Sequence, residues 1–188
     1  MNVKTGMSLF IVAIMILSVI GFVLVDVGTD DASRTYGNYT FYRTSQGWRA
    51  QVAGQQMYFN FLPDQVNRIP VDERSRQILT SSPIVGVTYD PADKFAQPMS
   101  QLQFYLEQLL NENQRVFVLR GLTNNSAFPA LQELTCANAT QSLPIIVMER
   151  QNETSVSASE WCVHAQAATS QEVFMLADRL LYVILGVL

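Results

Sequence analysis

The sequence predicts a mixed α/β domain that follows a single N-terminal transmembrane helix, and three observations lead to this fold class. Residues 5–25 form a run of twenty-one residues without a charged side chain. Residues 39–61 alternate apolar with polar positions, as the strands of a half-buried sheet do. From residue 84 onward, short apolar segments alternate with helical patterns, which is typical of α/β and α+β folds.

Composition bounds the class of protein. The chain has 188 residues and a formal net charge of -4, with 48% hydrophobic and 15% charged residues. A chain of this length holds one domain, alone or with an anchor. The hydrophobic fraction excludes a disordered chain, and the acidic balance argues against a nucleic-acid partner. One histidine and two cysteines exclude arrays of zinc fingers and c-type haem attachment.

Residues 7–25 are the apolar core of the predicted transmembrane helix. The charge-free run would be about 30 Å long as a helix, which matches the hydrocarbon core of a bilayer. A cleaved signal peptide, the alternative, has a shorter apolar region and a small-residue cleavage site, and neither is present. Lys4 precedes the helix and Asp26 follows it, so the positive-inside rule puts the N-terminus in the cytoplasm. We therefore expect a single-pass cell-membrane protein, with residues 1–25 as cytoplasmic tip and signal anchor.

Two features of the predicted extracytoplasmic part agree with export. Asn-x-Ser/Thr acceptors for glycosylation occur at Asn38, Asn124, Asn138 and Asn152. Cys136 and Cys162 are the only cysteines, so an oxidising compartment would join them in one disulfide. The alternative is a pair of unlinked thiols.

The domain is expected over residues 39–188, after a small, polar linker at residues 26–38. Its first part predicts a three-stranded antiparallel meander that ends at Pro63, because short alternating segments are separated by glycine turns. The three strands lie at residues 39–43, 48–53 and 55–61. A charged segment that carries Ile78 and Leu79 near its end predicts a short helix over residues 71–80.

The second part predicts a βαβ unit, two more strands and a closing helix. The expected elements are a strand at 84–89, a helix at 99–113, a strand at 116–119, a helical turn within 128–136 and a strand at 143–148, followed by a hairpin partner at 161–165 and a helix at 171–187. The closing helix ends in nine uncharged residues, too few to span a bilayer, so we expect it to pack on the sheet. The alternative is a terminus that dips into the membrane or docks to another membrane subunit.

The element order of residues 82–188, with Pro144 directly before a strand, resembles the thioredoxin-like fold and its cis-proline. The resemblance implies a βαβ-ββα arrangement. It departs from the family where the redox pair belongs, because Tyr89 to Asp93 stand after the first strand and the chain has no Cys-x-x-Cys. The resemblance therefore does not bring oxidoreductase activity by that mechanism.

Three further stretches look familiar: residues 54–59, residues 136–146 and residues 177–186. Together they resemble a set of uncharacterised archaeal membrane-anchored proteins, in which an N-terminal helix precedes a small α/β domain with two cysteines. This resemblance implies a location in the cell envelope. It implies no activity.

Few residues are candidates for chemistry. Neither Gly-rich phosphate cradle is present, and a single histidine excludes a His-Glu-x-x-His zinc site. Cys162 and His164 stand two apart on a predicted strand and share a face, which with Cys136 gives three candidate zinc ligands. We expect instead a disulfide beside a hydrogen-bonded histidine. A Cys-His nucleophilic pair lacks an apparent orienting Asn.

Asp90 and Asp93 could act as paired carboxylates in general acid/base catalysis, but beside Pro91 we expect a turn and a helix start. The sequence thus assigns no catalytic, cofactor-binding or metal-binding residue, and no cofactor.

Aromatic residues are dense in residues 36–61. Most are expected to pack between sheet and helices. The alternative is an exposed aromatic patch suited to a protein or glycan partner. We expect a non-catalytic binding or assembly module of the cell envelope, with no nucleic-acid partner. The alternative is a thioredoxin-like enzyme or cofactor-binding domain without the redox Cys-x-x-Cys.

Overall fold

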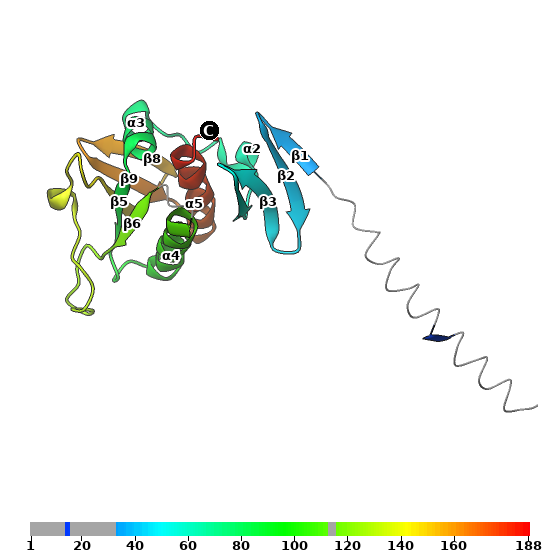
Figure 1. Ribbon diagram of the computed structural model, residues 1–188. Helices are drawn as coiled ribbons and strands as arrows, with labels where there is room; N and C mark the ends of the chain where they lie inside the picture. The colour runs from blue at the N-terminus through cyan, green and yellow to red at the C-terminus, as the bar shows by residue number, and fades with distance from the viewer. Residues whose placement is uncertain (1–13, 16–32, 113–115) are drawn as a thin grey trace, which may run out of the picture. The chain divides into compact units, whose positions relative to one another are not determined.

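The computed structural model describes residues 14–15, 33–112 and 116–188 (Figure 1). The chain divides into two units, Met1–Ala32 and Ser33–Leu188. The second unit contains every strand and helix named below. It is a mixed α/β structure with two sheets.

The first sheet is a four-stranded antiparallel meander in chain order. Its strands are β1 (Ser33–Tyr36), β2 (Tyr39–Thr44), β3 (Gly47–Val52) and β4 (Gln55–Phe59). Strands β2 to β4 cover the three predicted strands, whereas β1 lies in the segment expected to be a linker. The β2–β3 turn needs glycine at position 47, where φ is +126° and a Cβ atom would collide with the carbonyl oxygen of Phe59.

Period-two alternation decides which side chains of this sheet are buried. The inward positions are fully buried and belong to the main core; they are Phe41, Ala50, Val52, Met57 and Phe59. The outward positions stay in contact with solvent. In register they place Tyr42 beside Arg49, and Arg49 beside Tyr58.

Two short helices connect the sheets. Helix α2 (Pro63–Val66) begins with proline at its first turn, and α3 (Glu73–Ser81) begins after Asp72, whose Oδ1 accepts a 2.6 Å hydrogen bond from the Ser75 amide. Helix α3 therefore occupies the segment in which a short helix was predicted.

The second sheet has five strands in the order β6-β5-β7-β9-β8. The strands are β5 (Ile84–Tyr89), β6 (Phe117–Arg120), β7 (Ile145–Arg150), β8 (Ser155–Ser159) and β9 (Cys162–Ala167). Helix α4 (Ala96–Glu112) crosses over between the parallel strands β5 and β6, as the βαβ prediction required. Strands β5, β7 and β9 are also parallel, and β8 is an antiparallel edge strand beside β9.

The predicted thioredoxin-like arrangement is wrong at this point. We expected residues 161–165 to form a hairpin with residues 143–148, but β9 runs parallel to β7. The reason is β8, a strand that was not predicted from the sequence. Its presence lets the chain reverse twice before β9 enters the sheet. The described residues contain no cis peptide bond, so Pro144 is not a cis-proline.

The predicted transmembrane helix also requires a correction. No helix of the described residues is long and apolar enough to cross a membrane. Helix α4 has 17 residues, and α5 (Ser170–Ile184) has 15 and carries charged residues, whereas a bilayer core needs about 20 apolar residues. This finding contradicts the predicted fold class with its N-terminal membrane helix and the predicted single-pass location at the cell membrane. Apart from residues 14 and 15, the segment 7–25 itself lies outside the described residues.

Helix α5 packs between the two sheets (Figure 1). Tyr182 stacks on Phe59 of the first sheet with ring centroids 4.7 Å apart, and α5 also contacts β9 of the second sheet. A helix covered on both sides must be apolar nearly all round, which explains the apolar C-terminal segment. The prediction that this helix packs on the sheet is confirmed, because residues 180–185 are all buried.

Candidate functional site

The second sheet has a face that the helices do not cover. Ile145 and Val147 of β7 and Cys162 of β9 point to this face and form a small second core with Leu134. Leu134 belongs to the long connection between β6 and β7. This connection therefore covers one face of the sheet, and helices α3 to α5 cover the other.

Hydrogen bonds and a glycine hold the connection against the sheet. Leu122 donates to the carbonyl of Gln132, and Leu134 donates to the carbonyl of Leu122, both at 2.9 Å. A Cβ atom at Gly121 would lie 2.6 Å from the Leu134 side chain and 2.8 Å from the Gln132 carbonyl oxygen. Glycine is thus needed at 121 because the strand and the connection approach each other so closely.

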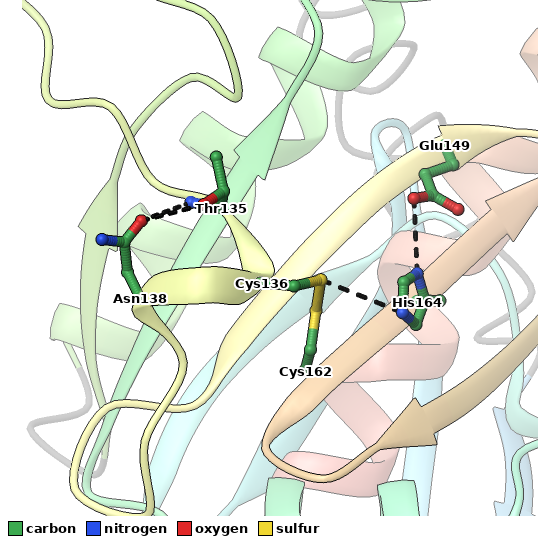
Figure 2. Close-up of a disulfide and its surroundings, with 6 residues drawn as sticks. All are labelled: Thr135, Cys136, Asn138, Glu149, Cys162 and His164. Atoms are coloured by element: carbon green, nitrogen blue, oxygen red, sulfur yellow. Dashed lines mark hydrogen bonds and ion pairs between the residues drawn. A yellow bond between two sulfur atoms is a disulfide. The ribbon is translucent and has the colours of Figure 1, made fainter.

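A disulfide joins Cys136 to Cys162, which confirms the predicted pairing. Cys136 is exposed and begins the single-turn helix η1 (Cys136–Asn138), whereas Cys162 is 3% exposed on β9. The turn before Cys136 is closed by Asn138, whose Oδ1 accepts hydrogen bonds from the backbone and side chain of Thr135 (Figure 2). Cys136 is therefore the exposed residue of the disulfide, and Cys162 is the buried one.

His164 lies between the disulfide and a carboxylate. Its Nε2 is 3.9 Å from Cys136 Sγ, and its Nδ1 is 3.3 Å from Glu149 Oε1 (Figure 2). His164 shares a face of β9 with Cys162, and Glu149 comes from the neighbouring strand β7. Both side chains are partly exposed, at 28% for His164 and 33% for Glu149. The three groups form a line of sulfur, imidazole and carboxylate.

This line borders a pocket of about 250 Å³. The disulfide and His164 form one wall, and Ala139, Ser159 and Trp161 contribute to the rest. Cys136 and His164 thus line the same pocket. The imidazole and the carboxylate of this site can transfer protons, and the disulfide can undergo thiol–disulfide exchange. The two sulfurs and His164 are also the kinds of ligand that soft metal ions prefer.

Three residues of this site were recognisable from the sequence, and the fourth, Glu149, was not. The sequence pattern placed Cys162 and His164 on one face, with Cys136 as a third candidate ligand, but it showed no group to orient the histidine. Glu149 lies in β7, one residue beyond the strand predicted at 143–148, and that strand was expected to pair antiparallel with residues 161–165. The parallel pairing of β7 with β9 is what brings Glu149 to the His164 ring.

Asp90 and Asp93 belong to a turn, as was expected for carboxylates beside Pro91. Asp90 Oδ1 accepts a 2.8 Å hydrogen bond from the Ala92 amide, and Asp93 Oδ1 accepts one of 2.7 Å from Phe95. Arg150 lies 3.6 Å from Asp93 Oδ2. These contacts shape the start of α4.

The four glycosylation candidates are all exposed. They are Asn38, Asn124, Asn138 and Asn152. Two of them use their side-chain oxygen locally: Asn138 in the turn described above, and Asn124 as acceptor from the amide and hydroxyl of Ser126. Their modification stays a prediction.

Asp178 is a buried carboxylate that the sequence analysis did not single out. Its Oδ2 accepts hydrogen bonds from the amides of Asn60 at 2.8 Å and Phe61 at 2.7 Å. Burial raises the pKa of this carboxyl to about 7. Asp178 therefore ties helix α5 to the end of β4.

The hydroxyl of Tyr105 completes this buried cluster. It lies 2.9 Å from Asp178 Oδ1 and 2.9 Å from the carbonyl oxygen of Tyr58. The hydroxyl has one proton, so when it donates to Tyr58, a proton on Asp178 must fill the other contact. The same burial and the Asp178 charge raise the pKa of Tyr105. The geometry thus suits a neutral Asp178.

The outward face of the first sheet is the second surface of interest, and we call Tyr42, Arg49 and Tyr58 the outer ladder. Tyr42 is 40% exposed and Tyr58 is 42% exposed. The Arg49 guanidinium lies 5.8 Å from the centre of the Tyr42 ring. Most other aromatic residues of this part are buried in the core or packed against it, as expected.

Comparison with protein-family models, curated proteins and solved structures finds no match to this chain. The resemblance to a set of archaeal proteins stays a prediction.

Proposed function

We propose that the chain works through a redox-active disulfide at Cys136. The observation that carries this proposal is the contact of Cys136 Sγ with His164 Nε2, whose other ring nitrogen meets Glu149. A thiolate beside a protonated imidazole is stabilised, and a carboxylate on the far nitrogen stabilises that imidazolium. A disulfide with a purely structural role needs neither of these two contacts.

Exposure decides which sulfur an external thiol attacks. A small thiolate reaches Cys136 Sγ in the pocket and forms a mixed disulfide there, because Cys162 is 3% exposed. The electron pair of the broken bond passes to Cys162 Sγ, which takes up a proton. A second thiol then attacks the mixed disulfide, and Cys136 leaves as a thiolate facing His164. The balance is one protein disulfide and two thiols giving two protein thiols and one external disulfide.

The test measures the reduction of the folded chain by glutathione, with thiols counted by alkylation and mass spectrometry. We expect the trapped glutathione adduct on Cys136, and slower exchange in His164→Gln and Glu149→Gln than in the wild type. Tyr58→Phe, which changes a hydroxyl on the outer ladder, is the matched control and should exchange at the wild-type rate. Wild-type exchange that both site variants leave unchanged would reject the proposal.

A second candidate function is binding of a partner through the outer ladder. This function corresponds to the non-catalytic binding module expected from the sequence. Two exposed tyrosine rings flank Arg49, and among the described residues Arg49 has no carboxylate within ion-pair distance. Gln56 extends the row by donating to the Tyr58 hydroxyl at 2.8 Å. Aromatic rings suit the apolar faces of sugars, and an unpaired guanidinium suits a carboxylate.

We therefore propose a glycan with uronic-acid units as the partner of the outer ladder. Titration of the chain with polygalacturonate should quench tyrosine fluorescence, and Arg49→Gln and Tyr42→Ala should each weaken binding. Matched neutral polysaccharide is the control for the carboxylate. Equal binding of the charged and neutral polymers, or no binding of either, would refute this assignment.

A further inference from the structure

The two cysteines and His164 have a second use that appears once the disulfide is reduced. We infer that the reduced chain binds one Zn²⁺ ion through Cys136 Sγ, Cys162 Sγ and His164 Nε2, and that the disulfide is the metal-free, oxidised state of this site. The inference rests on the proposed function in one respect, since both require that the two cysteines can exist as thiols in the folded chain.

The donor atoms already lie close enough for one ion. The two sulfurs and the nearer imidazole nitrogen are all within 4.8 Å of one another. Tetrahedral zinc with sulfur and nitrogen ligands holds them about 3.5 to 3.8 Å apart. The contact of 3.9 Å between Cys136 Sγ and His164 Nε2 is near that value. The two sulfurs must separate, and the remaining distances, none of which exceeds 4.8 Å, must close by about 1 Å at most.

The fold supplies one fixed side and one adjustable side. Cys162 and His164 stand on β9, which is hydrogen-bonded to β7 and β8 along both edges. Cys136 is exposed at the start of η1, so rotation of its side chain can move Sγ away from Cys162 without disturbing the core. Two ligands two residues apart on a strand and a third from a loop can thus close around an ion.

Glu149 determines which ring nitrogen of His164 binds the zinc ion. Its contact with Nδ1 favours a proton on that nitrogen, which leaves the lone pair of Nε2 directed at the sulfurs. A carboxylate behind a histidine ligand is the usual outer partner in zinc sites, and its loss weakens binding by roughly 10- to 100-fold. This contact separates the site from an ordinary disulfide with a histidine nearby.

The ligand set also selects the metal. Two thiolates and one imidazole favour zinc over magnesium or calcium, which prefer oxygen ligands. The pocket of about 250 Å³ leaves a fourth position for water or a small ligand. Binding is balanced by the release of two protons, one from each thiol. An external thiol is the reductant that converts the disulfide to the metal-binding form.

The experiment uses the whole chain reduced with a phosphine under anaerobic conditions, with two free thiols verified by alkylation. Co²⁺ is the spectroscopic probe. We expect one equivalent to give the thiolate-to-cobalt charge-transfer and visible bands of a tetrahedral site, and Zn²⁺ to displace it. Glu149→Gln should bind Co²⁺ roughly 10- to 100-fold more weakly, and His164→Gln more weakly still. The oxidised chain should give no such spectrum.

Three outcomes would overturn the inference. The reduced, folded chain could give no tetrahedral spectrum, His164→Gln could bind as tightly as the wild type, or reduction could unfold the chain with no recovery on adding Zn²⁺. The phosphine does not depend on exchange at Cys136, so slow glutathione exchange with a normal cobalt spectrum rejects the proposed function alone. Normal exchange without a cobalt spectrum rejects the zinc site alone.

Discussion

Glu149 and His164 stand on neighbouring parallel strands, and Glu149 Oε1 meets His164 Nδ1 at 3.3 Å. The contact turns the other ring nitrogen toward Cys136 Sγ. The histidine is therefore oriented by a residue of the sheet and not by the loop that carries Cys136. Movement of that loop would leave the imidazole and its carboxylate in place.

The disulfide should contribute to stability whatever its chemical role. The double variant Cys136→Ser with Cys162→Ala is expected to lower the free energy of unfolding by about 3 to 4 kcal/mol, because the unfolded chain gains the freedom of the opened loop. Urea denaturation followed by circular dichroism measures the loss. Reduction of the wild type should give a similar loss, and no change in either case would show that the loop is already constrained.

Asp178 should make stability fall as the pH rises from about 4 to about 7. Its folded-state pKa is raised from 3.8 to about 7, so the folded chain keeps a proton that the unfolded chain releases over this range. That contribution is present below the unfolded-state pKa and is lost as the pH passes the folded-state pKa. The decline is at most about 1.4 kcal/mol per pH unit.

The matched pair Asp178→Asn and Asp178→Ala tests this assignment. Asparagine copies the neutral carboxyl, since its oxygen can accept from the Asn60 and Phe61 amides while its nitrogen donates to the Tyr105 hydroxyl. We expect Asp178→Asn to flatten the pH profile of stability between 4 and 7. Asp178→Ala should be unstable at every pH. A variant profile parallel to the wild type in urea melts would show that other groups cause the slope.

Gly121→Ala should destabilise the connection that covers the second sheet. The added methyl group would lie 2.6 Å from the Leu134 side chain, and such overpacking costs roughly 1 to 3 kcal/mol. Leu134→Ala removes the nearest side chain, so Gly121→Ala should cost less in that background. Additive losses of unfolding free energy in this double-mutant cycle would mean that the Gln132 carbonyl, and not Leu134, sets the limit.

Thr88→Val should leave stability unchanged or raise it by about 1 kcal/mol. The Thr88 hydroxyl is fully buried on β5 and has no hydrogen-bond partner in the described part of the chain. Valine has nearly the same shape and removes the need to bury a hydroxyl. Thr88→Ser is the control, which keeps the hydroxyl and loses a methyl group. A marked loss of thermal stability in Thr88→Val would reveal a partner for the hydroxyl.

Local patterns predicted most of the strands but missed β1 and β8, and they did not show how the strands pair. The apolar segments at residues 84–89 and 143–148 correspond to β5 and β7 because buried strands need apolar side chains on both faces. Strand β8 has the sequence Ser-Val-Ser-Ala-Ser, whose polar residues resemble a turn, and it buries only Val156 fully. Because this weak edge strand was not predicted, the expected direction of β9 was the opposite of the observed one. Glu149 was therefore not recognised as a neighbour of His164.

The burial of two ionisable side chains in α5 was the other feature that local sequence patterns could not predict. Asp178 and Arg179 interrupt an apolar helix, and such residues usually mark the solvent side. Both are buried, at 0% and 3% exposure, because α5 is covered by a sheet on either side. Asp178 is satisfied by backbone amides from residues 60 and 61, which are distant in sequence. Only the three-dimensional arrangement supplies those partners.

The place of α5 between the two sheets constrains the order in which the domain can form. Helix α5 follows every described strand in the chain, yet it supplies part of the surface on which each sheet buries its inner face: Tyr182 stacks on Phe59 of the first sheet, and the helix contacts β9 of the second. A nascent chain that has emerged only as far as β9 would therefore expose two apolar sheet faces at once. The fold is complete only after α5 has also left the ribosome, and until then the chain depends on cellular factors that shield exposed apolar strands.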